Sequence, residues 1–135
     1  MKSPADCHRL LIYGGTFDPP HRAHVELPFA VAEQIEADGV LFIPAGAPPH
    51  KPADDRTAAA HRAAMIWLAV ADRANAWVDR REIERAGPSY TADTLRELAG
   101  ELPGTELRLL IGADMALIFD QWREPEVIER LARSE

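Results

Sequence analysis

The loop over residues 14–24 reads Gly-Gly-Thr-Phe-Asp-Pro-Pro-His-Arg-Ala-His, and so combines two glycines, a hydroxyl, a carboxylate and two histidines. A glycine turn that leads into a helix can bind phosphate, because free backbone N–H groups and the positive end of the helix dipole face the anion. His21 and His24 are spaced i, i+3, so at a helix start both rings can donate hydrogen bonds to oxygens that gain charge in a transition state. The alternative is a glycine turn with two surface histidines, and local chemistry alone favours neither.

Two other segments carry hydroxyls or cations that suit an anion. In Pro48-Pro-His-Lys51, His50 and Lys51 lie beside a rigid diproline turn and could form a second anion contact, or belong to an ordinary polar loop. The segment Ser89-Tyr-Thr-Ala-Asp-Thr-Leu95 begins a helix, and Ser89 or Thr91 offers a hydroxyl there. Such a helix start suits a small carboxylate, although a plain capping motif would look the same.

The last chemically distinctive segment is Ile111-Gly-Ala-Asp114, which Trp122 follows. Asp114 could bind a ligand or cap a helix, and Trp122 could stack on a ring or anchor the core. Both alternatives remain open at this point.

Alternating strands and helices must position these loops. Apolar runs between turn residues predict strands, and apolar residues at helical spacing predict helices. Pro28 predicts a kink or a late start in the first helix, and Trp67 is expected in the core. Residues 80–86 are ambiguous, with an extended stretch as the interpretation. The predicted strands are 9–13, 39–44, 76–79 and 106–111, and the predicted helices are 22–36, 56–72, 89–100 and 125–131.

This alternation predicts an α/β fold, a Rossmann-like three-layer sandwich with a parallel sheet covered on both faces. Ligands then bind at the carboxyl ends of the strands, which assigns the chemistry to Gly14–His24, Ala45–Lys51 and Ile111–Asp114. The alternation stops one strand early. We therefore expect the strand 106–111 to form an exposed edge, through which the chain could form a homo-oligomer.

Composition narrows the classes of function. A chain of 135 residues predicts a single domain over 1–135. Fifteen basic and 22 acidic residues give a net charge of −7, which excludes nucleic acid as an expected partner. Cys7, the lone cysteine, and the lack of a leader segment favour the cytoplasm. No apolar run reaches the roughly 20 residues that span a bilayer, so no membrane association is expected.

The loop over 14–24 resembles the Gly-x-Phe-Asp-Pro-x-His-x-Gly-His signature of the nucleotidyltransferase superfamily. The resemblance implies that His21 and His24 are catalytic and contact the triphosphate of ATP, and that the backbone of Gly14–Phe17 (Gly14, Gly15, Thr16 and Phe17) approaches the phosphates. Ala23 departs from the signature, which has glycine there. An added methyl group at this position would crowd the nucleotide.

The remaining segments resemble those of bacterial nicotinate-nucleotide adenylyltransferases within this superfamily. The resemblance implies that His50 and Lys51 meet phosphates, that Gly112 and Asp114 contact the nucleotide ribose, and that Trp122 stacks on the pyridine ring. The helix start at Ser89, Tyr90 and Thr91 would hold the nicotinate carboxylate.

Such an enzyme joins nicotinate mononucleotide to the AMP of ATP and releases pyrophosphate, in NAD biosynthesis. Mg²⁺ would arrive bound to the substrate, and no protein metal site is expected. Two alternatives stay open: a nucleotide-binding module without turnover, and a transferase for another phosphorylated acceptor. The resemblance covers residues 10–131. Family members continue through a further strand and a Ser-Thr-x-x-Arg helix start, so we expect the family's last strand and helix to be missing and the domain to be incomplete at its C-terminus.

Overall fold

The computed structural model describes residues 3–15, 22–45, 55–85, 90–110 and 124–134, and only the backbone of residues 22–24, 55–59 and 133–134. Its strands are β1 (Arg9–Gly15), β2 (Gly39–Pro44), β3 (Ala76–Val78), β4 (Glu106–Leu110) and β5 (Ala132–Ser134). Its helices are the 3-10 helix η1 (Pro4–Asp6), α1 (Arg22–Gln34), α2 (Asp55–Val70), α3 (Arg81–Glu84), α4 (Thr91–Glu101) and α6 (Pro125–Leu131).

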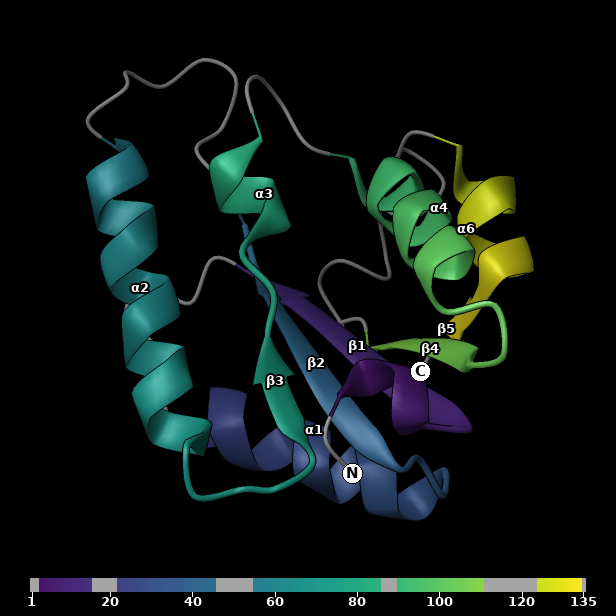
Figure 1. The fold of residues 1–135 in the computed structure, drawn as a ribbon, viewed down its shortest axis with the longest axis horizontal. Helices are drawn as coiled ribbons and strands as arrows, with labels where there is room; N and C mark the ends of the chain where they lie inside the picture. The colour runs from purple at the N-terminus through teal and green to yellow at the C-terminus, as the bar shows by residue number, and fades with distance from the viewer. Residues whose placement is uncertain (1–2, 16–21, 46–54, 86–89, 111–123, 135) are drawn as a thin grey trace.

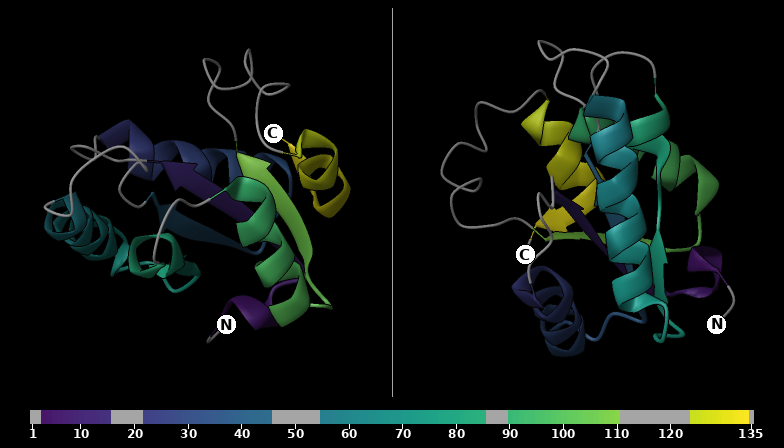
Figure 2. Two further views of the ribbon diagram at one scale, coloured as in Figure 1. Left: turned by 90° about the horizontal axis from the view of Figure 1, so that it is seen from above. Right: turned by 90° about the vertical axis from the view of Figure 1, so that its left-hand side faces the viewer.

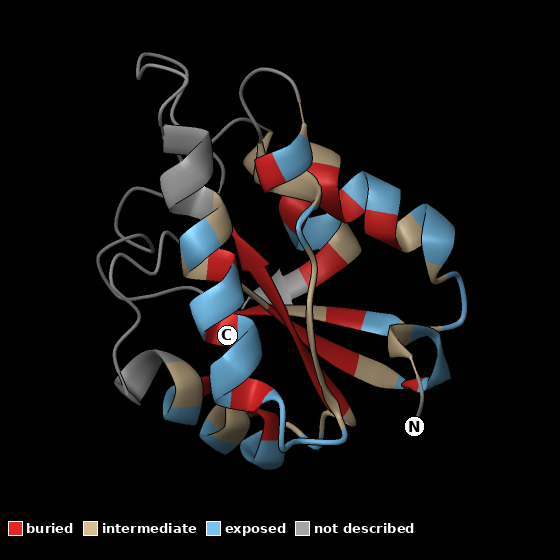
Figure 3. Cartoon of the chain, turned by 60° about the vertical axis from the view of Figure 1, so that its left-hand side comes forward, coloured by how far each residue is buried: buried red, intermediate tan, exposed pale blue. Residues whose placement is uncertain are grey.

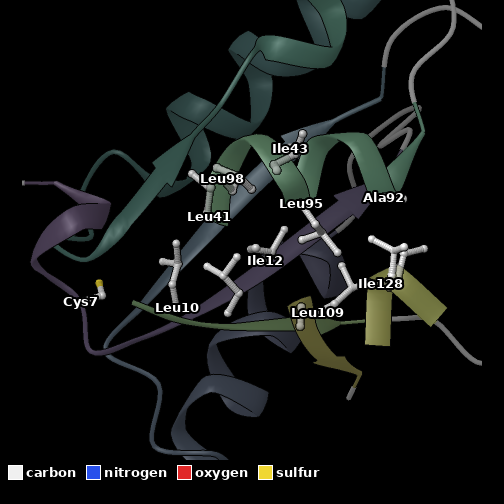
Figure 4. Close-up of a cluster of buried hydrophobic side chains, with 13 residues drawn as sticks. Cys7, Leu10, Ile12, Leu41, Ile43, Ala92, Leu95, Leu98, Leu109 and Ile128 are labelled. Carbon is white, nitrogen blue, oxygen red and sulfur yellow. The ribbon is translucent and has the colours of Figure 1, made fainter. Parts of the chain in front are cut away.

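The strands form one parallel sheet in the order β3-β2-β1-β4-β5 (Figure 1). Strand residues alternate between its two faces, as a strand period of two requires. On one face, Leu10 and Ile12 of β1 pack in a buried cluster with α4 and α6 (Figure 4). On the other face, Leu11 packs with Ala32 of α1 and Ile66 of α2. The predicted three-layer α/β fold is confirmed, and Figure 2 shows it from two further directions.

The expectation that 106–111 lies at an exposed edge is wrong. β4 pairs with β1 on one side and with β5 on the other, where Leu107 lies opposite Ala132. β5 is three residues long and includes Arg133 and Ser134, so it lacks the apolar run by which the other strands are recognised. The edge position beyond β4 is therefore taken by a strand that the sequence pattern does not reveal.

The expected core position of Trp67 is also wrong. Its side chain is 59% exposed, whereas Ile66, the residue before it, is fully buried. Residues 65–68 are all large and apolar, so the sequence pattern does not select which of them faces the sheet. The structure selects Ala63, Ile66 and Val70, and buried and exposed residues alternate along α2 (Figure 3).

Three local predictions also change. Residues 81–84 form a helical turn instead of an extended stretch, because the Asp79 carboxylate accepts the Arg81 N–H at 2.9 Å and Ile83 is buried. α1 begins at Arg22 and includes Pro28, so its start is not late. Tyr90, rather than Thr91, is the N-cap residue of α4, and Ser89 lies outside the described residues.

The amino ends of β1 and β2 are joined by Asp38. Its carboxylate accepts the backbone N–H groups of His8 at 2.7 Å and Arg9 at 2.9 Å. These hydrogen bonds to the charged form lower the pKa of Asp38, with the Arg9 N–H as the largest cause. Arg9 in turn donates through its side chain to the Glu106 carboxylate of β4 and to the Ile35 carbonyl. The amino ends of β1, β2 and β4, which lie opposite the ends that carry the predicted loops, are therefore held together by contacts of charged side chains.

Candidate functional site

The predicted functional loops leave from one end of the sheet, where the strands have their carboxyl ends. β1, β2 and β4 are parallel, and they end at Gly15, Pro44 and Leu110. Gly15 lies opposite Pro44 in the β1–β2 register, and the Ala45 N–H donates to the Gly15 carbonyl at 2.8 Å. Tyr13 lies opposite Leu110 in the β1–β4 register. The predicted segments starting at Gly14, Ala45 and Ile111 therefore begin at adjacent carboxyl ends.

The direction of chain crossing reverses between β1 and β4. From β1 the chain continues to β2 and β3 on one side, and then returns to place β4 and β5 on the other side. Crevices outside such a reversal point are the usual ligand sites of open α/β sheets. Gly14 and Gly15 end β1 at this point.

Gly14 has room for a side chain among the described residues. A Cβ atom added there would lie 3.6 Å from the Ile43 carbonyl oxygen, an ordinary van der Waals distance. Gly39, in contrast, has no such room: a Cβ atom there would lie 2.6 Å from Cζ3 of Trp77 and 3.0 Å from the Cys7 sulfur. The packing described here therefore explains a glycine at position 39 but not at position 14.

The start of α4 lies toward the same end of the sheet (Figure 4). In Figure 4 the labelled side chains of the buried cluster extend from Cys7, at one end of β1, to Ala92 near its arrowhead. Ala92 and Leu95 are fully buried, so the first turns of α4 pack closely on the sheet. Of the predicted mononucleotide-binding residues, Tyr90 is the N-cap of α4 and Thr91 its first residue, directly before the buried Ala92.

A polar network that the sequence interpretation missed joins α3 to α4. The Thr94 hydroxyl donates to Glu82 at 2.8 Å, and Arg85 donates to both Glu97 oxygens at 2.9 and 2.8 Å. Arg81 donates to both carboxylate oxygens of Glu101, at 2.9 and 2.7 Å. Thr94 belongs to the motif 89–95, but its partners lie on a segment without a clear pattern. Only the tertiary structure brings them together.

Burial and charge act in opposite directions within this network. Burial raises the pKa of Glu82, while the hydrogen bond from Thr94 and the charge of Arg85 partly oppose that rise. For Arg81 the hydrogen bond to Glu101 is the largest cause of a raised pKa, and Asp79 adds to it. Arg81 is therefore a permanent cation held between carboxylates.

Most of the other predicted site residues lie outside the described part of the chain. His24 has a described backbone in the first turn of α1, as the sequence predicts, but its side chain is not described. The predicted residues outside the described ranges are Thr16, Phe17, His21, His50, Lys51, Ser89, Gly112, Asp114 and Trp122.

Within the described ranges, no group of three or more His, Cys, Asp or Glu side chains could hold a metal ion. The same described residues contain no helix that is both long and apolar enough to cross a membrane.

Comparison with known proteins gives a family match along nearly the whole chain. The model of the family described as cytidylyltransferase-like matches residues 12–133. A protein of Chromobacterium violaceum named "Probable nicotinate-nucleotide adenylyltransferase" is 45% identical over 125 residues, which are 92% of this chain and 59% of that protein. A protein of the same name from Geobacter metallireducens is 44% identical, over 87% of this chain and 54% of its own length. The chain thus spans little more than half the length of these relatives.

Solved structures agree on the fold. Plasmodium falciparum nicotinic acid mononucleotide adenylyltransferase complexed with NaAD superposes with a TM-score of 0.72 at 18% identity, over 87% of this chain and 58% of that one. The same enzyme complexed with APC gives a TM-score of 0.70 at 17% identity, over 88% and 58%. At this identity the likeness concerns the fold.

Proposed function

The chain belongs to the cytidylyltransferase-like family, and on that premise we propose that it is an adenylyltransferase that joins nicotinate mononucleotide to the AMP of ATP. The observation that carries the proposal is the placement of the predicted loops. Three segments with nucleotide-binding motifs leave from adjacent carboxyl ends of β1, β2 and β4, and the start of α4 lies beside them. The names of the relatives in Chromobacterium violaceum and Geobacter metallireducens support the choice of acceptor.

The reaction is an in-line transfer of the adenylyl group. An oxygen of the mononucleotide phosphate attacks the α-phosphorus of ATP and forms a new P–O bond. The bond from that phosphorus to the bridging oxygen breaks, and its electron pair leaves with pyrophosphate. The protein supplies no nucleophile, so its contribution is to position both phosphates and to stabilise the charge that develops on their oxygens.

Each predicted residue has a role in this transfer. His21 and His24 donate to the triphosphate at the start of α1, where the helix dipole also favours negative charge. Thr91 and the start of α4 hold the nicotinate carboxylate, and Trp122 stacks on the ring. ATP and phosphate binding is assigned to Gly14, Gly15, Thr16, Phe17, His50, Lys51, Gly112 and Asp114, and mononucleotide binding also to Ser89 and Tyr90.

Mg²⁺ enters this proposal as part of the substrate. ATP carries it on its phosphate oxygens, and Mg²⁺ commonly binds through substrate phosphates and water rather than in an all-protein cage. The described residues offer no cluster that would serve as such a cage.

The proposal is tested by incubating the chain with ATP, Mg²⁺ and a panel of phosphorylated acceptors while pyrophosphate release is measured. We expect release with nicotinate mononucleotide and less with the amide form, because a helix start favours a carboxylate over a neutral amide. Release only with a different acceptor would reject the choice of substrate. ATP binding without release in any mixture would instead support a binding module without turnover.

A further inference from the structure

α4 is held by side chains of different kinds on different faces. Ala92, Leu95 and Leu98 are buried against the sheet. A neighbouring face carries Thr94, Glu97 and Glu101, which are spaced three and four residues apart and therefore point the same way. These three residues meet α3 and the residue that follows it.

α3 is anchored elsewhere, on the β3 side of the sheet. Its buried residue Ile83 forms a small cluster with Ala63 of α2, against which Val78 of β3 packs. The two helices therefore rest on different parts of the sheet. Their described connections are hydrogen bonds and ion pairs between long side chains, with Glu82, Arg85 and Arg81 on the α3 side.

The central hydrogen bond of this network joins the buried Thr94 to the half-buried Glu82. Thr94 is 2% exposed and its hydroxyl donates to Glu82. Arg85 lies 3.4 Å from the same hydroxyl oxygen and donates to both carboxylate oxygens of Glu97. The backbone N–H of Thr94 also donates to the Tyr90 carbonyl at 3.1 Å, which closes the first turn of α4. One residue thus connects the helix start, its N-cap residue and α3.

Stability alone is a poor reason for this arrangement. Partly exposed ion pairs contribute little to stability, and the half-buried Glu82 carboxylate carries a desolvation cost that well-packed apolar side chains would avoid. Directional hydrogen bonds and paired Arg–carboxylate contacts do, however, fix one relative position of two elements, which apolar contacts do less specifically.

We propose that Glu82, Arg85 and Thr94 are positioning residues that fix the first turn of α4, and with it Tyr90 and Thr91, for binding of the acceptor mononucleotide. This inference rests on the proposed function, because it assigns the helix start to the acceptor. The three residues act through the helix and touch no substrate. Their loss should therefore weaken acceptor binding much more than ATP binding.

The decisive variant is Thr94→Val, which removes the hydroxyl and nearly keeps the shape. We expect the KM for nicotinate mononucleotide to rise about tenfold or more, since small displacements of a binding group are costly. The KM for ATP should stay within about twofold. Thr94→Ser, which restores the hydroxyl, should restore the KM for the acceptor.

A matched control removes an ion pair at the opposite end of the sheet, where β1 and β4 begin. Glu106→Gln breaks the contact with Arg9 at the amino ends of β4 and β1. It should leave both KM values within about twofold. A second measurement, hydrogen exchange, should show faster exchange of the amide of residue 94, which donates to the Tyr90 carbonyl, in Thr94→Val than in Glu106→Gln, whether or not the enzyme turns over.

The outcomes separate the two claims. If the unmutated chain is active and Thr94→Val changes neither KM, or raises both KM values equally, the positioning role is overturned and the proposed function stands. If the unmutated chain neither releases pyrophosphate nor binds nicotinate mononucleotide in calorimetry, the proposed function fails and this inference fails with it. A selective rise in the acceptor KM, reversed in Thr94→Ser, supports the positioning role.

Discussion

The Thr94 hydroxyl donates a hydrogen bond of 2.8 Å to the Glu82 carboxylate, so a half-buried acid of α3 faces a buried hydroxyl of α4. Burial is the largest cause of the raised pKa of Glu82, so the folded protein binds a proton there more readily than the unfolded chain does. Its ionisation therefore opposes folding. We expect the contribution of Glu82 to the free energy of unfolding to fall as the pH rises from about 4.5 through the folded pKa of this residue.

Glu82→Gln should remove this contribution to the pH dependence, because an amide does not titrate. The measurement is urea unfolding of both proteins between pH 4 and pH 8. The difference in unfolding free energy between them should change in the direction that favours Glu82→Gln as the pH rises. If the difference in unfolding free energy between the two proteins stayed constant across this pH range, the raised pKa of Glu82 would be contradicted.

Asp38 should show the opposite dependence, in a lower pH range. Its pKa lies below the ordinary value of 3.8, chiefly because its carboxylate accepts the N–H of Arg9. Its contribution is therefore present above that value and is lost as the pH falls through the folded pKa. At neutral pH, Asp38→Asn should lower the unfolding free energy by about 1 kcal/mol, since the backbone N–H groups of His8 and Arg9 lose a charged acceptor and keep at most a neutral one. Glu33→Gln, at an exposed position of α1, is the control and should have little effect.

Two glycine substitutions separate a structural from a binding role. Gly39→Ala should destabilise the protein by about 1–3 kcal/mol, because its methyl group would overlap Trp77. Gly14→Ala should change the unfolding free energy by about 0.5 kcal/mol or less, since the new Cβ has an ordinary contact with the Ile43 carbonyl oxygen. It should nevertheless weaken ATP binding if phosphates approach this backbone. Calorimetric titration with ATP beside thermal unfolding measures both effects. Unchanged ATP affinity in Gly14→Ala would remove Gly14 from the proposed site.

Two neighbouring residues of α2 should differ sharply in their effect on stability. Ile66 is fully buried, so Ile66→Ala should lower the unfolding free energy by about 2–5 kcal/mol. Trp67 is 59% exposed, so Trp67→Ser should lower it by about 0.5 kcal/mol or less. Chemical denaturation of the two variants measures the contrast. A larger loss in Trp67→Ser than in Ile66→Ala would show that the helix packs through the other face.

The sequence predicts the elements that have a clear apolar pattern or a strong boundary signal, the three-residue β3 included, and it misses β5 and α3. β1, β2, β4 and α6 appear where apolar runs and Pro125 predict them, because their patterns are long or bounded by strong signals. β5 and α3, with three and four residues, are too short to show a period. Tertiary contacts define them instead, such as the burial of Ile83 and the pairing of β5 with β4.

The candidate site divides in the same way. Gly14 and Gly15 end β1 and Thr91 begins α4, close to where the sequence predicts this strand to end and this helix to begin, while their binding roles stay predictions. The roles of His21 and His24 remain predictions. The network of Glu82, Arg85 and Thr94 was not predicted, because Thr94 lies 9 residues from Arg85 and 12 from Glu82, and no spacing rule pairs them.

The most direct measurement is the formation of the dinucleotide from ATP and nicotinate mononucleotide, detected by mass spectrometry, for the unmutated chain and for His24→Ala beside their thermal melts. We predict product from the unmutated chain. His24→Ala should form it about a hundred- to thousandfold more slowly, because the loss of one donor to a developing charge costs about 3 kcal/mol. Its melting temperature should hardly change, because a ring that donates to the substrate and not to the core, as proposed, contributes roughly 0.5 kcal/mol or less to stability. The absence of product from the unmutated chain, or equal rates in the two proteins, would contradict the account.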